Sequence, residues 1–162
     1  MNIFDHAIRF EREGVVLYSR LAKKTRDGGL RNIFKWLADQ EERHREIIVK
    51  LKAGRPVSGR GRVNFKRIKG IFRKMKRHVE EMEARPSAVA AYKAALVVER
   101  RSMVFYGTRA RATKVAEERE ILQMLAGEER KHMVVLENLL EFMDEPSEWA
   151  EDAEFVKLDR GE

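Results

Sequence analysis

Apolar residues recur at steps of three and four through most of the 162 residues, which is the spacing of one face of an α-helix. Four such stripes follow one another, and no segment alternates apolar and polar residues as a half-buried strand would. The pattern therefore predicts an all-α protein with four long helices. The stripes are Phe4, Ile8, Val15, Tyr18 and Ala22; Phe34, Leu37, Ile48 and Leu51; Tyr92, Leu96, Met103, Tyr106 and Ala110; and Leu122, Leu125, Leu136 and Leu139.

Glycine, proline and serine residues mark the breaks between these helices. Asp27-Gly28-Gly29 predicts a turn between the first two helices, and we expect a second turn near Thr113-Lys114-Val115. Ser87 is the expected N-cap of the third helix, and Pro146 is expected to end the fourth or to follow its end.

The connection over residues 53–86 carries an apolar stripe of its own. This stripe predicts an extra helix in the crossover, with one face packed on the bundle or on a second subunit. Its members are Phe65, Ile68, Phe72, Met75 and Val79, and it continues to Met82.

The two halves of the chain repeat. A shift of 88 residues superposes the stripes, so that Tyr18 meets Tyr106 and Leu37 meets Leu125. Two similar helical hairpins joined by one long crossover are typical of a four-helix bundle. We expect the bundle to span residues 1–143 and an acidic tail to occupy residues 144–162.

Each stripe is interrupted by residues that ordinarily avoid a core. Glu11 and Glu99 interrupt the first and third stripes, and a Glu-x-x-His pair interrupts each of the other two. Burying a carboxylate is unfavourable unless it is paired or bound to a metal, so four in one core need compensating charge. All six residues obey the 88-residue shift: Glu11 and Glu99, Glu41 and Glu129, His44 and His132.

The spacing of these residues predicts that they meet. Glu11 and Glu41 are 30 residues apart, and so are Glu99 and Glu129, so a chain that reverses midway returns each pair to one level. A Glu and a His at i and i+3 share a helix face. Four carboxylates with two imidazoles suit iron or manganese, and two divalent cations balance four negative charges. One Glu-x-x-His pair would favour an ordinary surface helix, but two matched copies favour a di-metal site.

These motifs resemble the rubrerythrin branch of the ferritin-like di-iron proteins over residues 2–143. The resemblance implies a ferritin-like four-helix bundle that holds two iron ions, with manganese as an alternative metal. It is carried by Phe34-Lys-Trp-Leu-Ala-Asp-Gln-Glu41-Glu-Arg-His44, by Glu11-Arg-Glu-Gly-Val-Val-Leu-Tyr18, by Glu99 through Tyr106, and by Glu128-Glu129-Arg-Lys-His132. The implied metal ligands are Glu11, Glu41, His44, Glu99, Glu129 and His132, with Glu41 and Glu129 as the bridges.

The resemblance also implies a function, namely reduction of hydrogen peroxide or dioxygen in protection against oxidative stress. Rubrerythrins usually carry a rubredoxin domain with four cysteines, whereas this chain has none, so we expect an external electron donor such as a rubredoxin-type protein. They also tend to have an additional Glu three residues after the third-helix ligand, where this chain has Ser102. Two other functions stay open: a ferritin-type ferroxidase that handles iron, and a nucleic-acid or interaction module with a structural metal.

Four further residues lie next to the candidate ligands. Tyr18 and Tyr106 each follow a ligand Glu by seven residues on the same helix face. They either act near the metals, as hydrogen-bond donors or as redox-active phenols, or are core tyrosines satisfied locally. Gln40 and Glu128 each precede a ligand His by one helical turn, and either orient the imidazoles or are solvated surface residues.

Composition and charge narrow the class of protein. The absence of cysteine excludes a disulfide framework and cysteine metal sites. No apolar run reaches the ~18 residues of a membrane span, and the N-terminus does not resemble a secretory leader, so we expect a cytoplasmic protein that forms a small homo-oligomer, a dimer. The net charge of +7 is concentrated between Lys52 and Val79, where 11 basic residues meet no acidic one. This basic segment suits a solvated helix face better than nucleic acid.

Overall fold

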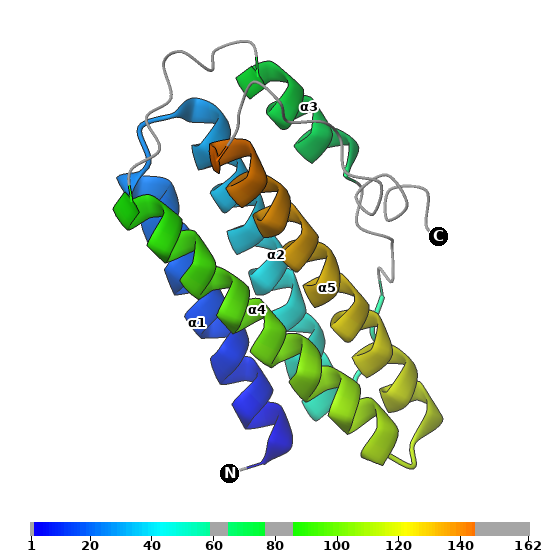
Figure 1. The fold of residues 1–162 in the computed structure, drawn as a ribbon. Coiled ribbons are helices and arrows are strands. Elements are labelled where there is room, and N and C mark those ends of the chain that lie inside the picture. Colours follow the sequence, from blue (N-terminus) through cyan, green and yellow to red (C-terminus); the bar gives the residue numbers. More distant parts are fainter. Residues whose placement is uncertain (1, 59–64, 77–85, 145–162) are drawn as a thin grey trace.

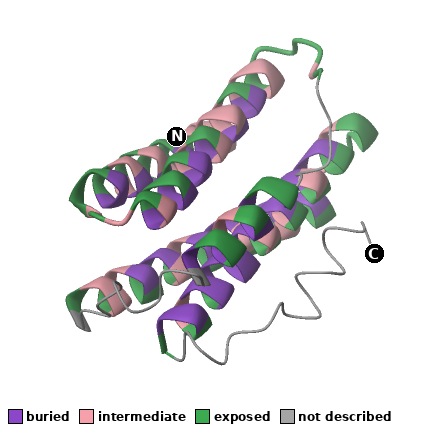
Figure 2. Cartoon of the chain, turned by 90° about the horizontal axis from the view of Figure 1, so that it is seen from above, coloured by how far each residue is buried: buried purple, intermediate pink, exposed green. Residues whose placement is uncertain are grey.

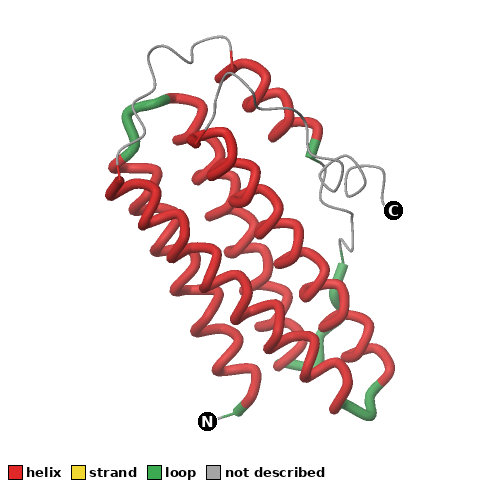
Figure 3. Tube along the Cα trace, in the orientation of Figure 1, coloured by secondary structure: helices red, strands yellow, loops and turns green. Residues whose placement is uncertain are grey.

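The computed structural model describes residues 2–58, 65–76 and 86–144, and within these ranges it contains five helices and no strand (Figures 1 and 3). The short helix α3 (Lys66–Lys76) lies outside the bundle, near the end at which α2 begins and α5 ends. The predicted all-α fold, with an extra helix in the crossover, is confirmed. The long helices are α1 (Ile3–Lys24), α2 (Gly28–Lys52), α4 (Pro86–Ala112) and α5 (Ala116–Asp144).

The turns within both hairpins are short. At the first turn the Asp27 side chain caps α2, because its Oδ1 accepts a hydrogen bond of 2.8 Å from the backbone N–H of Leu30. The second turn occupies residues 113–115, between the end of α4 and the start of α5, as predicted.

The N-cap predicted for the third long helix is wrong. Helix α4 begins at Pro86, so Ser87 is a residue of its first turn and not its cap. Proline is favoured at the first helical position, because the N–H that it lacks would have no partner in the helix. Helix α5 ends at Asp144, two residues before Pro146. Pro146 itself, the acidic tail, and Val79 and Met82 lie outside the described residues.

The helices pair as two antiparallel hairpins, α1 with α2 and α4 with α5, and the closest backbone approaches are within the hairpins. In the view from above, buried residues line the surfaces that the hairpins turn toward each other (Figure 2). None of the described helices combines the length and the apolar character that a membrane crossing requires.

Helix α3 packs its apolar stripe on the bundle. The ring of Phe72 contacts Phe142 of α5 with centroids 6.0 Å apart, and the ring of Phe65, just before α3, lies 6.4 Å from that of Trp36 in α2. Ile68 and Met75 are also buried. The opposite face of α3 is basic, with exposed residues Lys66, Arg67, Arg73 and Lys74.

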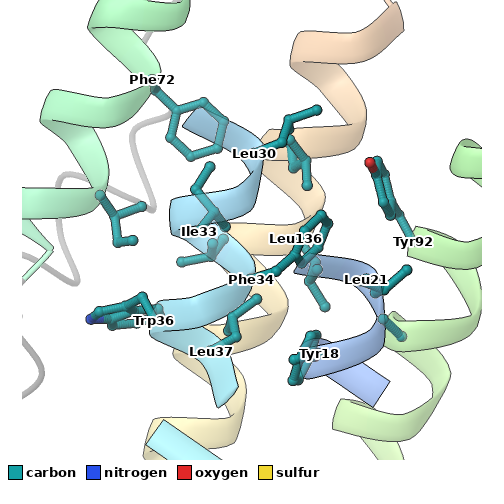
Figure 4. Close-up of a cluster of buried hydrophobic side chains, with 14 of the residues drawn as sticks. Tyr18, Leu21, Leu30, Ile33, Phe34, Trp36, Leu37, Phe72, Tyr92 and Leu136 are labelled. Carbon is teal, nitrogen blue, oxygen red and sulfur yellow. The ribbon is translucent and has the colours of Figure 1, made fainter. Parts of the chain in front are cut away.

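Two hydrophobic clusters fill the interior. The α3 cluster lies at the end covered by α3 and includes Tyr18, Phe34 and Leu136 (Figure 4). The basal cluster lies at the other end and includes Ile48 and Leu125. On each of the four long helices, the candidate ligands lie in sequence between the residues of the two clusters. The bundle therefore has an ionisable layer between two apolar ones.

Candidate metal centre

The six residues that interrupt the apolar stripes are all buried in this middle layer. Helices α1 and α4 each contribute one glutamate, and helices α2 and α5 each contribute a Glu-x-x-His pair. The most exposed of the six side chains is Glu41, at only 3%. The set comprises Glu11, Glu41, His44, Glu99, Glu129 and His132.

Oxygen and nitrogen atoms of these residues form two overlapping groups. Within each group, one such atom from every residue lies within 4.8 Å of the others. Glu41 and Glu129 belong to both groups, which is the arrangement expected of carboxylates that lie between two cations. The first group is Glu11, Glu41, His44 and Glu129, and the second is Glu41, Glu99, Glu129 and His132.

Both imidazoles present Nδ1 to the carboxylates. His44 Nδ1 lies 3.2 Å from Glu129 Oε1 and 3.5 Å from Glu11 Oε2. His132 Nδ1 lies 2.9 Å from Glu41 Oε1 and 3.2 Å from Glu129 Oε2. The two rings stack, with centroids 5.3 Å apart and planes inclined by 12°. Each Nε2 therefore lies on the side of its ring away from the four glutamates of the cluster.

Several buried atoms of the cluster lack a hydrogen bond among the described residues. Glu41 Oε1 and His132 Nδ1 are 2.9 Å apart, yet neither has a partner in hydrogen-bonding geometry. Glu11 Oε2 and Glu129 Oε2 also have none. Buried polar atoms normally have partners, so this concentration of unpaired acceptors needs an explanation. Carboxylate oxygen and imidazole nitrogen suit iron or manganese, and the residues present fit a pair of such ions.

Without cations, the cluster retains protons. Burial, reinforced by the charges of Glu11 and Glu99, raises the pKa of Glu129 to about 8. Burial also raises the pKa of Glu41 well above its usual range. For His44, burial by itself lowers the pKa, but the carboxylates of Glu129 and Glu11 outweigh it and raise the pKa well above its usual range. Bound protons thus partly neutralise the buried carboxylates when no cation is present.

Two tyrosines hold candidate ligands across the hairpin interface. The Tyr18 hydroxyl of α1 donates to Glu99 of α4, and the Tyr106 hydroxyl of α4 donates to Glu11 of α1. Burial and then the nearby carboxylates raise the pKa of both phenols well above the usual range, so both remain protonated donors. Both tyrosine hydroxyls therefore contact the cluster, and the interpretation of core tyrosines satisfied locally is wrong.

A further contact could not be decided from the sequence. Glu128 of α5 is 3% exposed, and its Oε2 lies 2.6 Å from His44 Nε2 and also accepts a hydrogen bond from Arg43. Burial by itself raises the pKa of Glu128, but these hydrogen bonds outweigh it and lower the pKa to about 2. Glu128 is therefore not a solvated surface residue, which was one of the two interpretations left open by the sequence. The sequence hinted at the contact only through the position of Glu128 directly before the candidate ligand Glu129.

Two small residues, Gly14 and Ser102, occupy equivalent positions of the repeat beside the middle layer. A Cβ atom at Gly14 would lie 2.6 Å from Glu41 Oε2, so glycine at this position lets the carboxylate lie against the α1 backbone. Its counterpart in the repeat is Ser102, which is also buried. Neither position carries an additional carboxylate.

A buried layer of carboxylates and imidazoles inside two helical hairpins defines a ferritin-like bundle of the metal-carboxylate class. A model of the rubrerythrin family matches residues 2–140, and the chain belongs to the rubrerythrin family. The family resemblance of the motifs is thereby confirmed. Members of this family typically bind iron, and the buried Glu/His cluster fits a di-iron site. No match was found among curated proteins or among solved structures.

Proposed function

We propose that the protein is a rubrerythrin-type oxidoreductase that reduces hydrogen peroxide at a carboxylate-bridged di-iron site. In this proposal Glu11 and His44 hold one ion, Glu99 and His132 hold the other, and Glu41 and Glu129 bridge them. The single observation that supports it best is the membership of Glu41 and Glu129 in both atom groups. A site for one ion would not need two residues in common.

The reaction converts one hydrogen peroxide, two protons and two electrons into two waters. When bound, two ferrous ions supply one electron each to the O–O bond, which is the chemistry that this layer of residues otherwise lacks. The protein has to keep the ions fixed, exclude bulk water and deliver protons.

The residues around the cluster suit the first two of these tasks. The α3 cluster and the basal cluster enclose it on both sides, which excludes water from the ionisable layer. Tyr18 and Tyr106 hold Glu99 and Glu11 in place, because their hydroxyls donate hydrogen bonds to these two candidate ligands. We assign them the role of holding the two carboxylates in position.

The electrons come from outside these 162 residues. No cysteine is present, so no iron–sulfur centre of the rubredoxin type can form within them. We propose a separate donor, a rubredoxin-type protein, that re-reduces the site after each turnover.

Anaerobic loading with Fe²⁺ followed by rapid mixing tests the proposal. We expect two iron ions per chain, faster oxidation by hydrogen peroxide than by dioxygen, and repeated turnover with peroxide when a reductant is supplied. A Glu129→Ala chain that remains helical is the matched control and should show neither iron uptake nor oxidation.

The rival function is ferritin-type iron oxidation. Ser102 lies where the resemblance implies an additional Glu, and the lack of that carboxylate counts against the usual peroxidase cycle. The rival function predicts faster reaction with dioxygen and continued uptake of iron beyond two ions per chain. Either result would replace peroxide reduction as the proposed activity. A chain that takes up no metal would overturn both functions.

A further inference from the structure

The two imidazoles of the cluster do not have the same surroundings. On the side away from the four glutamates of the cluster, His44 Nε2 lies 2.6 Å from Glu128 Oε2, and both groups are buried. The corresponding atom of His132, its Nε2, is buried and has no hydrogen-bond partner among the described residues. The internal repeat predicts equal surroundings, so this difference arises from particular residues.

The two halves of the chain differ in charge at the repeat position that contacts His44. The 88-residue shift places Gln40 on Glu128, a neutral amide on a carboxylate. Gln40 Oε1 is likewise buried and has no partner in the described part of the chain. On the outer side of the rings, α5 therefore supplies His44 Nε2 with a charged acceptor, whereas His132 Nε2 has no hydrogen-bond partner among the described residues.

Glu128 is held in place and is not itself a candidate ligand. Its Oε2 accepts from Arg43 as well as from His44, and the side chain of Glu128 is 4% exposed against 31% for Arg43. The imidazole of His44 stands between Glu128 and the cluster, because Nδ1 faces Glu129 and Nε2 faces Glu128. Glu128 can thus act on a metal only through His44.

We propose that Glu128 is a positioning residue that makes the two metal positions unequal, so that the ion beside His44 binds first and more tightly than the ion beside His132. A carboxylate that accepts from the outer N–H of a ligating histidine fixes its tautomer and makes the inner nitrogen a stronger donor, and loss of such a partner typically costs about 10–100-fold in metal affinity. This inference rests on the proposed di-iron site and adds an order of loading to it.

Anaerobic calorimetric titration of the metal-free full-length chain with Fe²⁺ tests the order. The wild-type isotherm should have two steps whose dissociation constants differ by about 10–100-fold. In Glu128→Gln the tight step should weaken until the two steps merge. In Gln40→Glu the weak step should tighten until they merge, and the double exchange, Gln40→Glu with Glu128→Gln, should restore two steps. Circular dichroism checks that each variant is folded.

Mössbauer spectra of chains loaded with one equivalent of ⁵⁷Fe²⁺ give a second readout, which general loosening of the fold would not reproduce. One quadrupole doublet should dominate in the wild type and in the double exchange, and two should be populated in each single variant. Two equal steps in the wild type, or equal weakening of both steps by Glu128→Gln, would overturn the inference and leave the proposed function standing. A wild-type chain that binds no iron would instead refute the proposed function.

Discussion

The middle layer of the bundle and the two hydrophobic clusters beside it are equally buried, but they stabilise the protein in different ways. The α3 cluster is made of side chains such as Phe34 and Leu37 that are fully buried and need no partner but one another. The middle layer buries Glu11 and Glu129 to the same degree, and each has an oxygen without a hydrogen bond. Burial alone therefore does not indicate which residues stabilise the fold.

The hydrophobic clusters and the middle layer therefore contribute differently to stability. Hydrophobic burial supplies the free energy that holds the helices together, and part of it offsets the unfavourable burial of charge in the middle layer. In the proposed metal-bound form, cations would offset this cost, because binding energy at a site formed only on folding is folding energy. Changes in the clusters should alter stability, and changes in the layer should alter metal binding.

The largest expected difference is between substitutions at two residues that lie one helical turn apart on α5. Glu129→Ala should abolish binding of both ions, because Glu129 belongs to both atom groups, and should leave the chain helical. Leu125→Ala, in the basal cluster, should lower the free energy of unfolding by about 2–5 kcal/mol and should still bind two ions. Elemental analysis and thermal unfolding measure the two effects. Loss of metal in the leucine variant as well would mean that the regions are not separable.

The pH dependence of the metal-free protein should come next in size. The pKa of Glu129 is about 8 in the folded chain against 4.5 without perturbation, so the folded state binds the extra proton and stability falls as pH rises between these values. His44, His132 and Glu41 shift in the same direction. The melting temperature of the metal-free chain should therefore decrease from pH 5 to pH 9.

Redox-inactive Mn²⁺ provides the matched condition for this measurement. It should reverse the trend, because metal displaces the protons and binds more tightly as pH rises. A metal-free melting temperature that rises over this pH range would contradict the retention of protons by the layer.

A smaller effect is expected from one methyl group beside the layer. Gly14→Ala should weaken metal binding, because the new Cβ would lie 2.6 Å from Glu41 Oε2 and must displace that carboxylate. Gly127→Ala is the matched control, since nothing lies within 4 Å of its Cβ position, and it should stabilise the helix by about 0.4–1 kcal/mol without changing metal affinity. Isotherms for Mn²⁺ with both variants measure the difference. Equal Mn²⁺ affinities of the two variants would show that the Glu41 side chain can move aside without weakening the site.

The smallest effect should come from removing one hydroxyl. Tyr18→Phe deletes the donor to Glu99 and should weaken binding of the ion beside His132 more than that beside His44. Tyr106→Phe, which deletes the donor to Glu11, should do the opposite. The net contribution of a typical hydrogen bond is about 0.5–1.5 kcal/mol. Both variants should retain two ions per chain, and equal weakening of both positions by either one would argue against separate roles.

Much of this architecture could be predicted from the sequence because it follows from periodicity. The apolar stripes predicted the four long helices, and the 88-residue repeat showed which polar positions correspond. The convergence of Glu11 with Glu41 followed from the 30 residues between them. The contact between Glu128 and His44 could not be predicted. It depends on how α5 is rotated against α2, and a one-residue spacing does not determine whether a carboxylate faces solvent or the neighbouring helix. The start of α4 was missed because serine and proline both favour helix N-termini, at positions one residue apart.

The sharing of residues between the hairpins has a consequence for how the protein is made. The first hairpin emerges from the ribosome with Glu11, Glu41 and His44 but without Glu129, and the second supplies Glu99, Glu129 and His132 but not Glu41. Neither atom group is complete until both hairpins have docked. If these groups hold the proposed ions, a nascent chain cannot form either complete site until the second hairpin has been made as far as His132 and has docked on the first.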